Sequence, residues 1–213
     1  MRERLWDIAL VILYIYWYYC LSFGNHYLVK QLQQVSRLSN ILQSFRIWKY
    51  KMLSSHKSIN GKAVLHQPAQ INGKGKVCFR ESVHIGVINS PLFYNTYAYI
   101  EARKEGSEII FGNDVAINNN FCAIANEASI TIGDRTTIGL NCSIYNCNFH
   151  SLNPQNRRSH TGSSAAVIIG QNVFIGNNVS IWKGVSIGDN AVIAAGSTVT
   201  VNVAAGTTFS NFF

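Results

Sequence analysis

The sequence predicts a mainly β protein: a parallel β-helix preceded by an N-terminal helical, hydrophobic segment. An aliphatic residue returns every six positions from Ile169 to Val199, and Gly often follows it. Units this short cannot bury an apolar side chain alone, so they have to stack with the aliphatic residue turned inward. Asn and Asp are frequent between these residues, and Gly and Asn suit turns because they tolerate positive φ. A long apolar run near the N-terminus predicts the helix.

The N-terminal segment is predicted to cover residues 1–55. Its run from Leu5 to Phe23 is apolar and aromatic, and Asp7 is its one charged residue. The run is borderline in length for crossing a bilayer, and its Trp and Tyr residues favour the membrane interface. Basic residues follow, from Lys30 to Lys51. Two interpretations stay open: a membrane anchor followed by a basic amphipathic helix, or a hydrophobic helix packed on the β-helix or on a neighbouring subunit.

The β-helix is predicted to occupy residues 56–213. The six-residue spacing recurs at Ile132, Ile138 and Ile144, and also further upstream, but the register slips between these segments. It stops from about residue 150 to 166, where a polar stretch cannot supply inward-facing side chains. This predicts an external loop, and long loops in compact domains are often functional.

Charge and cysteine content argue against several classes of binding site. The net charge is +8, but the basic residues are scattered and no nucleic-acid motif accompanies them, so we expect no nucleic-acid partner. Five cysteines form no CxxC pair and no metal signature, and their odd number argues against a complete disulfide framework. We expect reduced thiols and no metal site. The predicted location is cytoplasmic, at the inner face of the cytoplasmic membrane if the anchor is present.

The repeat, the interrupting loop and the motif from Asn172-Val-Phe-Ile-Gly-Asn-Asn-Val to Ile187-Gly-Asp-Asn-Ala-Val-Ile-Ala-Ala-Gly-Ser-Thr-Val-Thr200 resemble the hexapeptide-repeat acyltransferases. The likeness is strongest to the galactoside, maltose and polysaccharide O-acetyltransferase branch. The resemblance implies a left-handed β-helix, a homotrimer, and active sites between subunits that use acetyl-CoA. It implies transfer of an acetyl group to a saccharide hydroxyl, in surface polysaccharide or lipid-linked oligosaccharide biosynthesis.

The resemblance also assigns roles to residues of the loop. In this family a His at the start of the external loop removes the proton from the acceptor hydroxyl, and His150 in Asn148-Phe-His-Ser matches that position. Arg157 follows at the spacing found in relatives and is expected to bind substrate. A sugar hydroxyl is a weak nucleophile at neutral pH, and imidazole is the side chain that titrates nearest that range. Cys147 is not expected to serve as a nucleophile.

Five coil residues match other binding positions of the family. Asn119 and Glu127 match acceptor contacts, although Glu127 is longer than the usual Asp. Asn177, Ala195 and Thr200 match cofactor positions, where small residues leave room for the pantetheine arm of CoA.

The cofactor end departs from the family in two ways. Val201 replaces a common Lys, and the chain ends at Phe213 without the usual Gly-x-Pro-Ala stretch and basic helix. Some contacts to the CoA phosphates are therefore expected to come from elsewhere, such as Lys183 or basic residues near the N-terminus.

Three alternative functions make different demands on the sequence. N-acetylation of an amino sugar would use the same base and fold. A carbonic anhydrase would need histidines of neighbouring coils to converge on a metal, and His84, His150 and His160 lack that spacing. A noncatalytic β-helix scaffold, including an ice-binding type, would need a regular Thr face, which only Thr131, Thr136 and Thr137 approach.

Overall fold

The computed structural model describes residues 24–56, 58–158 and 162–211, and side chains from residue 39 onward. The apolar run Leu5–Phe23 therefore lies outside the described residues, and its predicted role as an anchor stays a prediction. The chain divides into two compact units, residues 1–44 and 45–213. The helix α2 (Gly24–Leu53) runs through the division. Within the described residues no helix is both long enough and apolar enough to cross a membrane.

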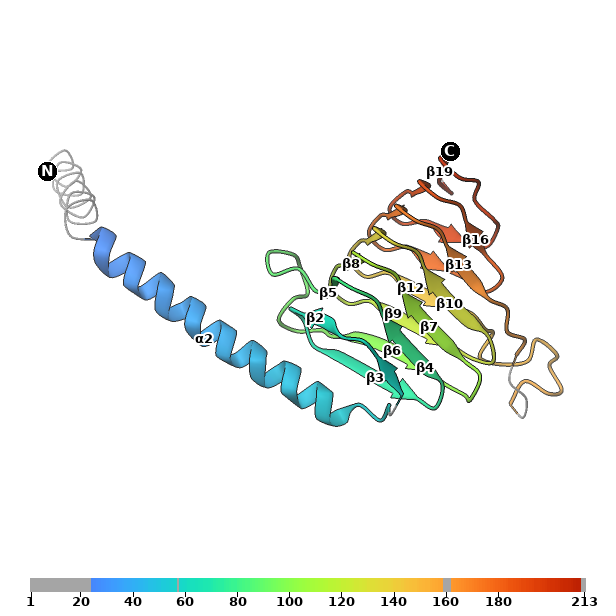
Figure 1. The fold of residues 1–213 in the computed structure, drawn as a ribbon, viewed down its shortest axis with the longest axis horizontal. Helices are drawn as coiled ribbons and strands as arrows, with labels where there is room; N and C mark the ends of the chain where they lie inside the picture. Colours follow the sequence, from blue (N-terminus) through green and yellow to red (C-terminus); the bar gives the residue numbers. More distant parts are fainter. Residues whose placement is uncertain (1–23, 57, 159–161, 212–213) are drawn as a thin grey trace, which may run out of the picture. The chain divides into compact units, whose positions relative to one another are not determined.

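The second unit contains three parallel sheets (Figure 1). Sheet A contains β1 (Ile59–Asn60), β4 (Lys76–Phe79), β7 (Glu108–Phe111), β10 (Ser129–Ile132), β13 (Val167–Ile169) and β16 (Ser186–Ile187). Sheet B contains β2 (Ala63–Leu65), β5 (Val83–Ile85), β8 (Ala116–Ile117), β11 (Thr137–Ile138), β14 (Phe174–Ile175), β17 (Val192–Ile193) and β19 (Thr208–Phe209). Sheet C contains β3 (Ala69–Gly73), β6 (Ala98–Ala102), β9 (Cys122–Ala125), β12 (Ser143–Tyr145), β15 (Ser180–Ile181) and β18 (Thr198–Val199).

The chain visits sheets A, B and C in turn, and each circuit forms one coil that stacks on the coil before it. In the regular part, Ile169 pairs with Ile187 and Ile175 with Ile193, so equivalent residues of successive coils lie side by side. The predicted fold class is confirmed: a mainly β, left-handed parallel β-helix with a helix before it. The coils begin at Ile59, well before the region where the spacing is regular.

The core lies inside the coils and is made by the residues that define the repeat. Ile169, Ile175, Ile181, Ile187 and Ile193 are all at most 2% exposed. Burying an aliphatic side chain of this size contributes about 1.5–3 kcal/mol, which only stacking can provide for such short strands. Phe79, Phe111 and Phe121 fill the wider upstream coils, and the first two stack at 5.0 Å.

Two loops leave the coils. The predicted loop joins β12 to β13 across residues 146–166, at the corner between sheets C and A. A second loop, residues 86–97, joins β5 to β6 at the corner between sheets B and C, and the sequence analysis missed it. Arg46 of α2 donates to the carbonyls of Phe93 and Thr96 at 3.1 and 2.7 Å. These contacts attach the last turns of α2 to the second loop within the second unit, and the predicted division at residue 55 stays a prediction.

Candidate active site

The predicted site residues lie along the two corners that border sheet C. We call the corner between sheets C and A, which carries loop 146–166, the loop corner, and the corner between sheets B and C the second corner. Four of these residues, namely His150, Arg157, Glu127 and Thr200, lie at the loop corner. The other three, Asn119, Asn177 and Ala195, lie at the second corner. The outer face of sheet C is therefore the surface between the two sets.

The base of the loop is fixed to the coils by backbone contacts. Cys147 and Ser164 form an antiparallel bridge, and the Asn148 amide donates to the Ser163 carbonyl at 3.1 Å. Below them, the Asn126 amide donates to the Asn146 side-chain oxygen at 2.7 Å. The loop thus leaves the coil from a rigid pair of strand-like segments.

His150 lies just beyond this base, and its side chain is exposed. Its Nδ1 is 3.2 Å from the carbonyl oxygen of Arg157. A carbonyl only accepts hydrogen bonds, so this contact places the proton on Nδ1 and leaves Nε2 with a lone pair. Gly162 packs against the same segment, because a Cβ there would lie 2.3 Å from the Asn148 oxygen and 2.5 Å from the His150 oxygen.

The other predicted residues of the loop corner differ in their contacts. The Arg157 guanidinium donates to the Leu152 carbonyl at 3.2 Å, so the side chain bends back onto its own loop. Glu127 sits in the turn between β9 and β10 with φ of 56°, and its half-exposed carboxylate pairs with Lys104. Thr200 is an exposed residue directly after β18.

Asn119 is fully buried and is bonded by the second loop. Its oxygen accepts from the Val87 amide at 3.0 Å, and its nitrogen donates to the carbonyls of Val87, Ser90 and Pro91 at 2.9–3.2 Å. All of these contacts are to backbone groups of one loop. Its role as an acceptor contact stays a prediction, and the geometry gives it a structural role that the sequence analysis did not include.

The predicted cofactor residues of the second corner lie on adjacent coils. The Asn177 oxygen accepts from the Leu140 amide at 2.8 Å. A Cβ on Gly176 would lie 2.6 Å from the Ala195 amide nitrogen, so the two turns are in close contact. Asn177 and Ala195 are thus brought together, whereas Thr200 lies across sheet C from them. Lys183, the expected substitute for a missing phosphate contact, bonds to the Ser163 hydroxyl of the loop.

The cysteines of this region are free thiols. Burial raises the pKa of Cys147, which lies three residues before His150. Burial also raises the pKa of Cys122, and that of Cys142 to about 11. A raised pKa keeps these thiols protonated and weakly nucleophilic at neutral pH, which agrees with the expectation that Cys147 is not a nucleophile.

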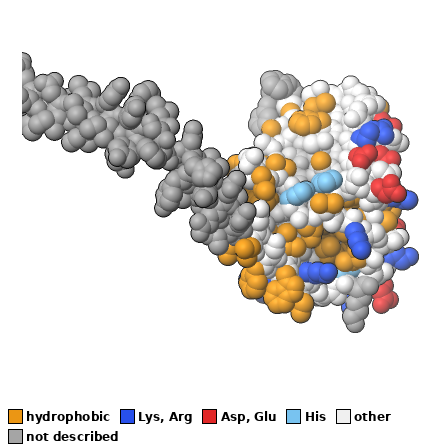
Figure 2. Space-filling model, turned by 60° about the vertical axis from the view of Figure 1, so that its left-hand side comes forward, with side chains coloured by type: hydrophobic (Ala, Val, Ile, Leu, Met, Phe, Trp, Pro, Cys, Tyr) orange, Lys and Arg blue, Asp and Glu red, His pale blue; other side chains and the backbone are white. Residues whose placement is uncertain are grey.

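Two histidines of the carbonic anhydrase alternative, His84 and His150, lie in different parts of the coils. His84 is stacked on His66 of the preceding coil with ring centroids 5.5 Å apart, and their Nδ1 and Nε2 atoms are 3.2 Å apart. Two neighbouring histidine side chains are visible on the face shown in Figure 2. His150 belongs to the loop corner, and His160 lies outside the described residues. Within the described part of the chain, no group of three or more metal-ligating side chains is placed to hold a metal ion.

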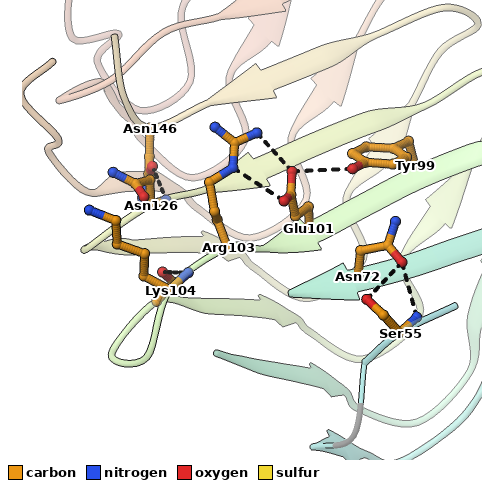
Figure 3. A network of polar contacts seen from close by, with 9 residues as sticks. Ser55, Asn72, Tyr99, Glu101, Arg103, Lys104, Asn126 and Asn146 are labelled. Atoms are coloured by element: carbon orange, nitrogen blue, oxygen red, sulfur yellow. Dashed lines mark hydrogen bonds and ion pairs between the residues drawn. The ribbon is translucent and has the colours of Figure 1, made fainter. Parts of the chain in front are cut away.

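Sequence reasoning missed a polar and aromatic network on sheet C beside the loop. Figure 3 shows the Glu101 carboxylate bonded to both Arg103 and Tyr99. Phe149, Tyr145 and Trp182 form an aromatic cluster at the loop corner. A cavity of about 710 Å³ opens on the same face toward the first coils. It is lined by Ser55, Ser58, Asn72, Gly73, Lys74, Tyr99, Glu101 and Arg103.

Comparison with known proteins finds a family model and several relatives that match this chain. Residues 166–201 match the family model described as the hexapeptide repeat of succinyl-transferase. Galactoside O-acetyltransferase of Escherichia coli (strain K12) is 37% identical over 98 residues, which are 44% of this chain and 48% of that protein. The enzyme of the same name from Lactococcus lactis is 32% identical over 98 residues, 46% of each chain. The match thus spans about half the length of these two relatives.

A solved structure gives a further likeness. It is a hexapeptide-repeat acetyltransferase of Vibrio cholerae in complex with acetyl-CoA. That protein is 25% identical and has a TM-score of 0.47, over 83% of this chain and 79% of the other.

Proposed function

We propose that the chain is a hexapeptide-repeat acyltransferase and, more narrowly, an acetyl-CoA-dependent O-acetyltransferase acting on a saccharide hydroxyl. The names of the two galactoside O-acetyltransferases support this class of reaction. The observation that carries the proposal is the bond between His150 Nδ1 and the Arg157 carbonyl. It gives the imidazole the tautomer that a general base needs.

The reaction is a direct transfer. Nε2 of His150 takes the proton of the acceptor hydroxyl as the oxygen attacks the thioester carbonyl carbon. The tetrahedral intermediate then breaks its C–S bond, the imidazolium returns the proton to the sulfur of CoA, and the acetyl ester leaves as product. A positioned base of this kind contributes about 10²- to 10⁴-fold to the rate.

The binding roles are part of the same proposal. Asn177, Ala195 and Thr200 would hold acetyl-CoA along the later coils, and Asn119, Glu127 and Arg157 would contact the acceptor. His150 is exposed on the single chain, whereas acyl transfer benefits from a site that excludes water. A second copy of the chain placed over the loop corner would supply that cover, so we propose a homotrimer with its sites between subunits.

The proposed acceptor belongs to surface polysaccharide or lipid-linked oligosaccharide biosynthesis, and the protein would act at the inner face of the cytoplasmic membrane through its N-terminal segment. Expression with and without residues 1–50 tests this part. Recovery of the full chain and the truncated chain in the same fraction after membrane sedimentation would contradict the anchor.

Release of CoA from acetyl-CoA tests the activity. The full chain is assayed with a panel of galactosides, glucosides and amino sugars, beside the variants His150→Ala and His84→Ala. His84 is an exposed histidine on sheet B and serves as the matched control. We expect turnover with at least one saccharide, a loss of 10² or more in kcat for His150→Ala, and none for His84→Ala. Unchanged turnover in His150→Ala would refute the mechanism, and turnover restricted to amino sugars would favour N-acetylation.

A further inference from the structure

An ion pair on the outer face of sheet C lies next to the loop. Arg103 donates through Nε to Glu101 Oε1 at 3.2 Å and through Nη2 to Oε2 at 2.9 Å. The Tyr99 hydroxyl donates to the same carboxylate at 3.2 Å. Figure 3 shows this arrangement, with the guanidinium of Arg103 directed at Glu101. Two parallel contacts fix both the position and the plane of the guanidinium.

The same guanidinium covers an aromatic ring of the loop. The Arg103 guanidinium carbon lies 5.2 Å from the centroid of the Phe149 ring, within the range of a cation–π interaction. Tyr145 of β12 meets the Phe149 ring edge to face, with centroids 5.5 Å apart and an angle of 77°. Tyr145 is in turn 5.3 Å from Trp182 of the next coil. Phe149 is thus held between a cation fixed on sheet C and an aromatic pair fixed on the coils.

Phe149 is the residue immediately before His150. The bridged base of the loop ends at Asn148, and the ring of His150 is hydrogen-bonded to the Arg157 carbonyl of the same loop. The Phe149 side chain is therefore the contact nearest to His150 that ties this side of the loop to the coils. Its position sets the direction in which His150 leaves the coil.

We propose that Arg103 is a positioning residue for His150, which acts through the ring of Phe149 and is itself oriented by Glu101. The kinetic consequence rests on the proposed acetyl transfer, but the effect on the His150 ring does not. A lysine could keep the charge at position 103. It could not bond Glu101 with two parallel donors while covering the ring with a flat cation.

The first experiment observes the imidazole directly. The full chain is labelled with ¹⁵N-histidine, and two-bond ¹⁵N–¹H correlations report which ring nitrogen carries the proton; His150→Gln assigns the signal. In the native chain we expect the Nδ1–H form. In Arg103→Met and in Phe149→Leu we expect His150 to shift toward the Nε2–H form with narrower lines, because a looser segment breaks the bond to Arg157. Phe149→Tyr keeps the ring and should keep the native spectrum.

The control variant is Arg80→Met, which removes the same charge from an exposed arginine directly after β4, at the corner between sheets A and B. It should leave the His150 signal unchanged. Circular dichroism and thermal melting of each variant verify that the β-helix is intact. A native His150 spectrum in folded Arg103→Met would overturn the proposal, whether or not the protein transfers acetyl groups.

The second experiment is a double-mutant cycle in the CoA-release assay, with the saccharide that gives turnover in the native chain. We expect Arg103→Met and Phe149→Leu each to lower kcat by about tenfold or more, since small displacements of a catalytic group are costly, while KM for acetyl-CoA changes less than about twofold. The double variant should be no worse than Phe149→Leu alone. Multiplicative losses would show that Arg103 does not act through Phe149 and would overturn this route.

Discussion

A substitution of Asn119 can distinguish a role in holding the second loop from the predicted role in binding the acceptor. Asn119→Ala leaves the Val87 amide without its acceptor and three carbonyls of the second loop without their donor. Removing one partner of a buried hydrogen bond typically costs about 1–3 kcal/mol, and some of these carbonyls can reach water once the loop loosens. We therefore expect a loss of about 2–4 kcal/mol in the free energy of unfolding.

The measurement is thermal and urea-induced unfolding of the full chain, combined with hydrogen exchange of residues 86–97. At about 2–4 °C per kcal/mol for a chain of this size, the melting temperature should fall by roughly 4–16 °C. Amides of the second loop should exchange faster than those of the coils. The matched control is Asn118→Ala, because the half-buried Asn118 side chain accepts one bond, from the Asn119 amide at 2.7 Å. That variant should lose about 1 kcal/mol or less.

The opposite result would restore the role predicted for Asn119 from the family resemblance. If Asn119→Ala unfolds within about 0.5 kcal/mol of the native chain but raises KM for the saccharide, its amide contacts the acceptor and the loop bonds are incidental. A loss of stability with unchanged KM would confirm the structural reading.

Three further predictions concern the loop corner and the thiols. Gly162→Ala should lower kcat strongly, because its Cβ would press on the His150 carbonyl. The control Gly106→Ala has open space around its Cβ but φ of 86°, and should cost only about 1 kcal/mol of stability. Equal kcat in Gly162→Ala and in the native protein would contradict this prediction. Cys147→Ser should retain turnover. An acetyl-enzyme that can be trapped in the native chain but not in Cys147→Ser would contradict direct transfer. Burial raises the pKa of Cys142 from its ordinary value of 9.0 to about 11. The unfolded chain then loses this proton first, so the free energy of unfolding should fall as the pH rises from 9 to 11, by up to about 3 kcal/mol. Urea titrations at successive pH values measure the fall, and an equal slope in Cys142→Ala would exclude Cys142 as its source.

The regular coils could be predicted because each six-residue unit repeats the same physical constraint. Ile169, Ile175 and Ile181 are buried because nothing else in their units can fill the interior. The second loop was not predictable in the same way, since Val87, Ile88 and Phe93 give it an apolar composition that resembles a strand. Phe93 is in fact buried, whereas Val87 and Ile88 are about half exposed.

The network at the loop corner could not be predicted because it depends on the register between coils of unequal length. Tyr99 pairs with Cys122, Cys122 with Ser143, and Ser143 with Ser180, so successive coils along this column span 23, 21 and 37 residues. No fixed period brings Arg103 and Phe149 together. The family resemblance pointed to His150, but the contacts that we propose to orient it come from sheet C and appear only once the coils are stacked.

The site can change through the outward-facing residues of sheet C. The coils tolerate substitution at outward positions because an outward side chain adds little to the core. Outward residues of sheet C can therefore be substituted without loss of core packing, although they lie next to the base of the loop. Tyr99, Glu101 and Arg103 occupy such positions and line the 710 Å³ cavity. Glu101 bonds to both Tyr99 and Arg103, and Arg103 lies over the ring of Phe149, the residue before His150. A substitution on this face alters the surface offered to an acceptor and the support of His150 at the same time. Acceptor preference and kcat should accordingly change together in variants of these three residues, and in variants of Asn177 or Ala195 at the second corner kcat should change without a change in acceptor preference.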